Sequence, residues 1–224
     1  MVTNRWLLLA LAFIASPLTL AQDKPPAEEA GVVSLFDGKT LSGWKGSTGA
    51  YTVENGAIVC VAGGRGNLLT EKEFADFDLR FEFKLTPGAN NGLGIRSPLS
   101  TEGNLHLEGI ELQIIDDTAE KYKTLQPYQF HGSIYGLVPA KTGSLKPVGQ
   151  WNQQQVIARG PRIQVIVNGT TIIDANLEET LKTGTLDDQP HPGASRKKGH
   201  LGFLGHGDRI EVRNIRIKEI MGGS

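Results

Sequence analysis

Four polar residues lie in or beside apolar runs at spacings that place them on one side of a sheet. Glu111 and Gln113 alternate with isoleucine and leucine, Arg96 follows a Gly-Leu-Gly-Ile run, and His206 stands between two glycines. Successive side chains of a strand point to opposite faces, so apolar residues facing the core leave these four on the outer face. Glycines at positions 92, 94 and 202 carry no side chain, which leaves room for a ligand on that face. A carboxylate, an amide, a guanidinium and an imidazole over such a floor suit a polyhydroxylated ligand.

Further residues are candidates for the same cleft. Asp116 begins an Asp-Asp pair at a strand end, where its oxygens could start a turn or bind calcium. His131 and Tyr135 flank another short strand pattern and could reach the cleft. Trp151 is either a core residue or a flat surface for stacking a sugar ring. The alternative for Arg96 is an ion pair with Glu111, and for the whole set it is an ordinary solvated sheet face.

The spacing of the carboxylates argues against a standard glycosidase site. Such enzymes use two carboxyl groups about 5–9.5 Å apart, and residues i and i+2 of one strand lie about 6.6 Å apart on one face. The i+2 partner of Glu111 is Gln113, an amide. A second acid would have to come from elsewhere, for instance Asp116 or Glu108. The chain also lacks a Gly-x-Ser-x-Gly elbow, a phosphate loop and a His-Glu-x-x-His helix.

Strand patterns dominate the chain. Residues 77–85 alternate apolar and polar side chains, which predicts a half-buried strand. Asn168-Gly169 between two β-rich runs predicts a tight hairpin. The apolar phase slips at Arg213-Asn214, which predicts a β-bulge, whereas helix patterns are short, as at 177–181. Further strand patterns cover 32–36, 51–53, 57–61, 91–96, 110–114, 133–135, 155–159, 163–167, 171–173 and 200–204.

Composition favours the same fold class. The chain has 224 residues, of which 28 are glycine, well above the usual share of about 7%. With many strands separated by turn residues, this predicts an all-β, two-sheet antiparallel sandwich, with a closed barrel as the alternative. The balance of 23 basic and 24 acidic residues argues against a nucleic-acid partner. A single cysteine excludes an intramolecular disulfide and a cysteine-based zinc cluster.

The N-terminus has the pattern of an export signal. Arg5 precedes an unbroken apolar run from Trp6 to Ala15, and Pro17 and Ala21 then resemble a breaker and a cleavage site. The run is shorter than the roughly 20 residues of a membrane span. We therefore predict a signal peptide at 1–21, a flexible tether at 22–30, one domain at 31–220 and a tail at 221–224. The exported chain would be periplasmic or secreted, without a membrane span after signal removal.

Nine short segments in chain order resemble one known family. They are 34–44 (SLFDGKTLSGW), 77–84 (FDLRFEFK), 91–97 (NGLGIRS), 111–117 (ELQIIDD), 132–135 (GSIY), 146–152 (KPVGQWN), 167–169 (VNG), 205–207 (GHG) and 212–220 (VRNIRIKEI). Together they resemble the 3-keto-disaccharide hydrolase family, formerly a domain of unknown function. The resemblance implies a concanavalin A-like two-sheet antiparallel jelly-roll sandwich. Two departures stand out, because the family often has Glu where this chain has Gln150, and Leu-Gln where it has Phe203-Leu204.

The resemblance also implies a reaction on sugars oxidised at carbon 3. The ketone acidifies the hydrogen at carbon 2, so a base can remove it and the glycosidic oxygen at carbon 1 leaves by elimination. Water then adds back, which completes a net hydrolysis without paired carboxylates. Such a site needs a base, a cation or metal to hold the enolate, and an acid for the leaving oxygen.

Candidate roles follow for the residues above. Glu111 or His206 would be the base, and Arg96 and Lys146 would stabilise the enolate. No cofactor is certain, but a divalent metal held by Glu111, His206 or Asp116 fits the resemblance. The predicted substrate-binding residues are Arg96, Gln113, Asp116, Tyr135, His131 and Trp151. The expected partner is a carbohydrate, a 3-keto-glycoside or another glycan, and the alternative function is a non-catalytic, lectin-like carbohydrate-binding module.

Overall fold

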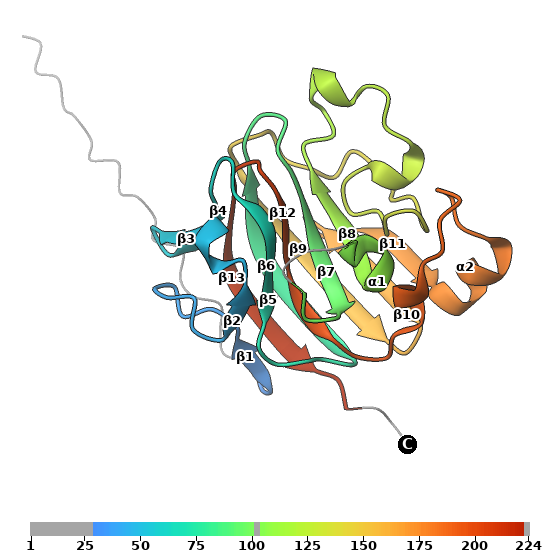
Figure 1. Ribbon diagram of the computed structural model, residues 1–224, viewed down its shortest axis with the longest axis horizontal. Helices are drawn as coiled ribbons and strands as arrows, with labels where there is room; N and C mark the ends of the chain where they lie inside the picture. Colours follow the sequence, from blue (N-terminus) through green and yellow to red (C-terminus); the bar gives the residue numbers. More distant parts are fainter. Residues whose placement is uncertain (1–28, 101–103, 222–224) are drawn as a thin grey trace, which may run out of the picture.

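A computed structural model describes residues 29–100 and 104–221 (Figure 1). The predicted signal peptide and most of the predicted tether lie outside these residues. Within them, no helix has both the length and the apolar character needed to cross a membrane.

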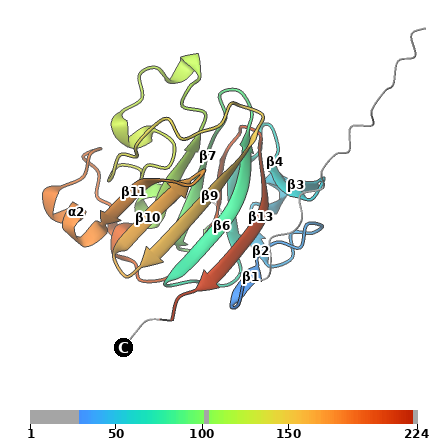
Figure 2. The same ribbon diagram turned by 180° about the vertical axis from the view of Figure 1, so that it is seen from behind.

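Two antiparallel sheets form the molecule, and Figures 1 and 2 show one sheet in front of the other from opposite sides. The small sheet has the order β2 (Trp44–Gly46), β5 (Arg65–Thr70), β12 (His200–His206), β7 (Asn90–Ser97) and β8 (Ile110–Ile115). The large sheet has the order β11 (Thr170–Asn176), β10 (Arg162–Val167), β9 (Trp151–Arg159), β6 (Phe77–Leu85), β13 (Ile210–Glu219), β4 (Ala57–Cys60) and β3 (Tyr51–Glu54), with β1 (Val32–Ser34) paired to β13. The predicted all-β, two-sheet antiparallel sandwich is therefore confirmed.

Short helices lie in the connections. They are α1 (Leu105–Glu108) and α2 (Leu177–Thr183), with 3-10 turns η1 (Thr48–Ala50), η2 (Glu120–Tyr122), η3 (Pro127–Gln129) and η4 (Pro192–Ser195). The predicted helix at 177–181 is confirmed as α2, whose first turn is capped by the Asn176 side chain. The connection with η2 and η3 rises above the end of β8 (Figure 1).

The core lies between the two sheets. Along β6 the burial alternates as the sequence predicted, with Phe81 and Phe83 facing inward. Phe81 meets Phe203 of β12 edge-on at 5.9 Å between ring centroids, and Trp44 stacks on the same ring at 5.9 Å. Full burial of each such ring contributes about 1.5–3 kcal/mol. These ring contacts pack the two sheets against each other across the core.

The structure contains both the tight hairpin and the β-bulge that the sequence predicted. Asn168 and Gly169 both have positive φ and join β10 to β11, as a tight hairpin turn requires. The register between β13 and β6 shifts between Arg213 and Arg216, and Asn214 adopts a φ of 53°. The predicted bulge is therefore confirmed.

Two features of the fold differ from the sequence prediction. Residues 133–135 are not a strand, because Ile134 makes only isolated bridges to Leu112 and Val138. Strands β2 and β5 lie where no strand was predicted. Their sequences mix glycine with single charged residues and lack a clear alternation, so pairing defines them: β5 pairs with β12, and β2 pairs with β5.

The outer face of the small sheet is partly covered. Every residue of β8 is buried, unlike the alternating pattern of β6. Leu69, Leu105 and Leu204 form a small apolar cluster on this face, where α1 packs against the sheet. The rest of the face lies beneath the connection that carries η2 and η3, and the candidate site is found there.

Candidate active site

A cavity of about 260 Å³ lies on the outer face of the small sheet. Its walls come from β7, β8, β12, α1 and the 116–135 connection. The lining residues are Asn90, His106, Glu111, Gln113, Ile115, Tyr122, Leu125, Gln129, Tyr135 and His206. Four of the predicted site residues, Glu111, His206, Gln113 and Tyr135, are therefore brought together.

Glu111 is the buried carboxylate of this cavity. It is 5% exposed, and its Oε1 has no hydrogen-bond donor among the described residues. The Nε2 atom of His206 lies 3.7 Å from Oε1, and the His206 side chain is 46% exposed at the mouth. Gly92 on the neighbouring strand makes room for the carboxylate, because a Cβ there would lie 2.0 Å from Oε1. The absence of a side chain at Gly92 thus defines where the Glu111 carboxylate lies.

An amide pair lines the cavity beside Glu111. The Nε2 atom of Gln113 donates a hydrogen bond of 2.7 Å to Oδ1 of Asn90. The Asn90 backbone N–H donates to Asp208, which fixes the start of β7. Within the described residues, Oε1 of Gln113 accepts no side-chain hydrogen bond, and Nδ2 of Asn90 donates none. The pair therefore offers one acceptor and one donor to a hydroxylated ligand.

Aromatic and imidazole rings form the opposite wall. The backbone N–H of Tyr135 donates to the carbonyl of Glu111, which places this tyrosine beside the carboxylate. Its hydroxyl accepts a 3.0 Å hydrogen bond from Gln129 Nε2, so its own proton remains available to a ligand. His106 and Tyr128 each meet the Tyr135 ring edge-on at 5.5 Å.

His106 is held by the buried pair of His191 and Asp187 behind it. Burial lowers the pKa of His106 below its usual 6.5, against the opposing effect of the nearby Glu111 carboxylate. The His106 carbonyl accepts a 3.2 Å hydrogen bond from His191 Nδ1, and His191 Nε2 lies 3.0 Å from Asp187. This pair ties α1 to the segment before η4.

Arg96 does not line the cavity, contrary to the prediction from strand parity. Its backbone has a φ of 48°, and the register of β7 with β12 shifts between His200 and Gly202. This irregularity turns the side chain away from the outer face. The guanidinium is 1% exposed and donates to the carbonyls of Ala75 and Gly160 and to Asp76. Arg96 therefore ties loops together within the fold.

We expect Arg96→Leu to lower the free energy of unfolding by about 3 kcal/mol, because it leaves buried acceptors and the Asp76 carboxylate without their donor. Urea denaturation measures the loss. The matched control is Arg162→Leu, which removes an exposed pair with Asp174 and should change stability by less than about 1 kcal/mol. A stable Arg96→Leu protein with altered substrate binding would contradict this structural role.

Three other predicted residues also lie away from the cavity. Asp116 accepts from the N–H of Gly88 and from the backbone and hydroxyl of Thr118, so it caps a turn. Lys146 is exposed and donates to the carbonyl of Trp151. Trp151 lies on the outer face of the large sheet, where Lys84 and Arg213 cover its ring. Asp116 and Lys146 lie outside the strands, where parity does not apply, and for Trp151 parity does not decide which sheet carries the side chain.

His131 is buried in the core instead of lining the cleft. Its ring stacks on Phe83 at 5.0 Å, and its Nδ1 accepts from the N–H of Ile115. Burial lowers the pKa of His131 to about 4. The neutral ring is therefore the form that the fold accommodates.

We expect acidification to destabilise the protein through His131. The unfolded chain binds a proton near pH 6.5 and the folded chain only near pH 4, so stability is lost as pH falls through this window. The loss reaches about 3 kcal/mol at pH 4. Urea denaturation at pH 4 to 7 measures it, and His131→Gln should flatten the profile by that amount. An unchanged slope in His131→Gln would refute the assignment.

The predicted metal ligands do not converge. Among residues 29–100 and 104–221, no group of three or more His, Cys, Asp or Glu side chains is placed to hold a metal ion. Asp116 is engaged in its turn, and Glu111 and His206 remain as a pair. The described residues therefore do not fit the predicted metal site.

Several lining residues were missed by the sequence analysis. They are Asn90, His106, Tyr122 and Gln129. Tyr122 and Gln129 belong to the 116–135 connection, and long ordered loops in a compact domain are often functional. His106 and Asn90 lie at element ends, where no periodicity distinguishes them from solvated residues.

The two departures from the family pattern have different surroundings. Gln150 is exposed in the turn before β9 and does not line the cavity. Leu204 is buried in the apolar cluster on the outer face of the small sheet, against Gly94. Only the second departure therefore changes the face that carries the cavity.

Known proteins resemble this chain in sequence and in fold. A 3-keto-disaccharide hydrolase of Bacteroides thetaiotaomicron is 26% identical over 231 residues, covering 86% of this chain and 80% of the relative. A structure from Parabacteroides distasonis, provisionally named a glycosyl hydrolase, has a TM-score of 0.73 at 29% identity, covering 84% of this chain and 99% of that one. The carbohydrate-binding module CBM66 of Bacillus subtilis shares the fold at a TM-score of 0.54 and 13% identity, covering 81% and 98%.

The structural similarities confirm the predicted lectin-like jelly-roll fold. The names of the Bacteroides relative and of the Parabacteroides structure indicate a carbohydrate-active, hydrolase-like protein. The family model for the 3-keto-alpha-glucoside-1,2-lyase-like domain matches residues 31–218, which is most of the chain. The family resemblance noted in the sequence is thus confirmed. The chain belongs to the 3-keto-alpha-glucoside-1,2-lyase-like domain family.

Proposed function

We propose that the protein cleaves the glycosidic bond of 3-keto-glycosides by removing the proton at carbon 2 of the oxidised sugar. The observation that carries the proposal is Glu111, a buried carboxylate whose Oε1 accepts no hydrogen bond from the described residues and lies 3.7 Å from His206. It is the single carboxylate among the lining residues. Ordinary glycosidases need two, whereas a ketone at carbon 3 acidifies carbon 2 enough for one base to suffice.

The reaction divides into two balanced steps. The base takes the proton from carbon 2, the electron pair of that C–H bond forms the enolate, and the C1–O bond breaks. The leaving oxygen is protonated, and the oxidised sugar becomes an enone with a double bond between carbons 1 and 2. Water then adds its hydroxyl to carbon 1 and a proton to carbon 2, which gives the free 3-keto sugar. No external oxidant or reductant is consumed.

Six of the lining residues have a place in this scheme. Glu111 is the base, because burial without a hydrogen-bond donor leaves its lone pairs free. His206 is the next proton carrier, since its imidazole lies beside Glu111 at the open mouth. The Tyr135 hydroxyl, held by Gln129, supplies a donor for the enolate or the leaving oxygen. The Gln113–Asn90 amide pair orients sugar hydroxyls.

The family description supports elimination, because a 1,2-lyase breaks the bond between carbon 1 and its oxygen with loss of the carbon 2 proton. The name of the Bacteroides relative supports a disaccharide substrate.

We also propose that the protein acts outside the cytoplasm, which the apolar run at 6–15 supports. Cell fractionation of a host expressing the full chain tests this part, and retention of an uncleaved cytoplasmic protein would contradict it.

The substrate test uses residues 22–224 with matched pairs of glucosides. Each 3-keto-glucoside is compared with its unoxidised parent, with and without EDTA, and aglycone release is measured. We expect release from the keto forms alone, together with exchange of the carbon 2 hydrogen in deuterated water. Release from the parents would contradict the mechanism and require a second carboxylate. Glycan binding without any release would instead favour a lectin-like module.

A further inference from the structure

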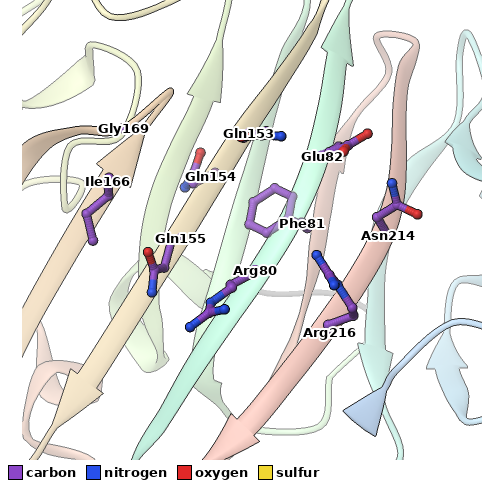
Figure 3. A pocket seen from close by; sticks show the side chains of 10 residues that line it. All are labelled: Arg80, Phe81, Glu82, Gln153, Gln154, Gln155, Ile166, Gly169, Asn214 and Arg216. Carbon is purple, nitrogen blue, oxygen red and sulfur yellow. The ribbon is translucent and has the colours of Figure 1, made fainter. Parts of the chain in front are cut away.

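The outer face of the large sheet carries a second cavity, of about 320 Å³ (Figure 3). It lies over β6, β9 and β13, on the opposite side of the sandwich from Glu111. Figure 3 shows Arg80 and Arg216 on neighbouring strands, with Gln155 and Asn214 beside them. Its volume far exceeds that needed by a water molecule or a single small ion.

Opposite charges face each other along most of the β6–β13 pair, with one exception at this cavity. Lys84 faces Glu211 and Glu82 faces Arg213 across the two strands, and each pair forms a 2.7 Å salt bridge. Arg80, however, faces Arg216 directly. Like charges directly opposite on paired strands are unfavourable. The exception therefore points to a role other than stability.

The two arginines differ in their partners. Arg80 is neutralised by Asp78 and Glu29, at 2.7 Å from each. Arg216 has no acidic partner and no hydrogen-bond acceptor within the described residues, and its Nε atom is shielded from solvent. The other charged lining residue, Glu82, is bound to Arg213. Arg216 is thus a half-buried cation without a counter-ion in a cavity.

We propose that this cavity binds an acidic sugar residue, whose oxyanion pairs with Arg216. A planar guanidinium matches the two oxygens of a carboxylate or the oxygens of a sulfate ester. The amides of Gln153, Gln155 and Asn214 suit the ring hydroxyls, and Ile166 provides an apolar contact for the ring. The site would hold an anionic glycan on the face opposite the catalytic cavity, and it stands independently of the proposed reaction.

Binding is tested by calorimetry at low ionic strength on residues 22–224, with glucuronate, glucose 6-sulfate, glucose and inorganic sulfate as separate probes. We expect an acidic sugar to bind at least tenfold more tightly than glucose or inorganic sulfate. Tighter glucuronate binding identifies a uronic acid, and tighter glucose 6-sulfate binding identifies a sulfated sugar. Equal binding of an acidic sugar and glucose, or of an acidic sugar and inorganic sulfate, would overturn the proposal.

Variants locate the site. Arg216→Gln should weaken binding of the acidic sugar at least tenfold. Arg159→Gln removes the same charge from the same face outside this cavity and should change it less than twofold. Glu111→Gln should leave it unchanged, which separates this site from the catalytic one. Undiminished binding by Arg216→Gln would overturn the assignment.

Thermal melting at low salt supplies a second readout. Arg216→Gln removes an unfavourable like-charge contact, so we expect its melting temperature to equal or exceed that of the parent protein. Arg213→Gln breaks the pair with Glu82 and serves as the reference for a structural arginine. An Arg216→Gln protein as destabilised as Arg213→Gln would mean that Arg216 maintains the fold, contrary to the proposal.

Discussion

Glu111→Gln is expected to lower kcat on a 3-keto-glucoside by about 10³-fold, within the range of roughly 10²–10⁴ typical for loss of a general base. Glutamine has the same shape but cannot accept the carbon 2 proton. Because the carboxylate is buried and its Oε1 accepts no hydrogen bond from the described residues, its replacement should leave the melting temperature unchanged or raised. Initial rates over a range of substrate concentrations, with thermal melting alongside, measure both effects.

Glu108→Gln is the matched control for this prediction. Glu108 is an exposed acid at the end of α1 and does not line the cavity. Its replacement should leave kcat within about twofold. If Glu111→Gln retained more than a tenth of the parent kcat, another group would be the base. His106, whose pKa is lowered by burial, would be the next residue to replace.

Gly92→Ala is expected to lower kcat by about 10²-fold through the position of Glu111. A Cβ at this position would lie 2.0 Å from Oε1 and 2.7 Å from the carboxyl carbon, so the carboxylate must turn away. Misplacing a reacting group by about 1 Å lowers the rate by that order. Gly49→Ala is the control, because a Cβ at Gly49 meets nothing within 4 Å.

The double variant Gly92→Ala/Glu111→Gln tests whether the two effects share one cause. If Gly92 acts only by placing the carboxylate, the double variant should be no slower than Glu111→Gln alone. Near-ultraviolet circular dichroism should show the parent tertiary signal in all three proteins. Multiplied losses in kcat would show that Gly92 serves the reaction by a separate route.

Both predictions depend on a carboxylate whose surroundings come from two strands and a long connection. Glu111 and Gln113 were found from alternation along one strand, because period 2 decides which face a side chain joins. Alternation also predicted the sandwich, and the Asn168-Gly169 dipeptide predicted a hairpin. These are local properties, since each depends on residues a few positions apart in the chain.

Other parts of the site depended on contacts between distant segments. The positive φ of Arg96 and the register shift beside it reverse the parity that the sequence indicated, and Arg96 becomes a buried donor to loop carbonyls. Trp151 lies on the other sheet, covered by two cations. His106 reaches the cavity because α1 packs against the small sheet and is bound by His191, which Asp187 holds in turn.

The sequence alone therefore determined the fold class, the family and the face on which Glu111, Gln113 and His206 meet, since all three follow from short-range patterns. The tertiary structure alone decided which polar residues share that cavity and which stabilise the fold. The physical reason is that alternation along a strand determines which face of the sheet a side chain joins. Strand order, bulges and loop packing decide what lies next to it. Likewise, only the register of β6 and β13 shows that Arg80 and Arg216 face each other.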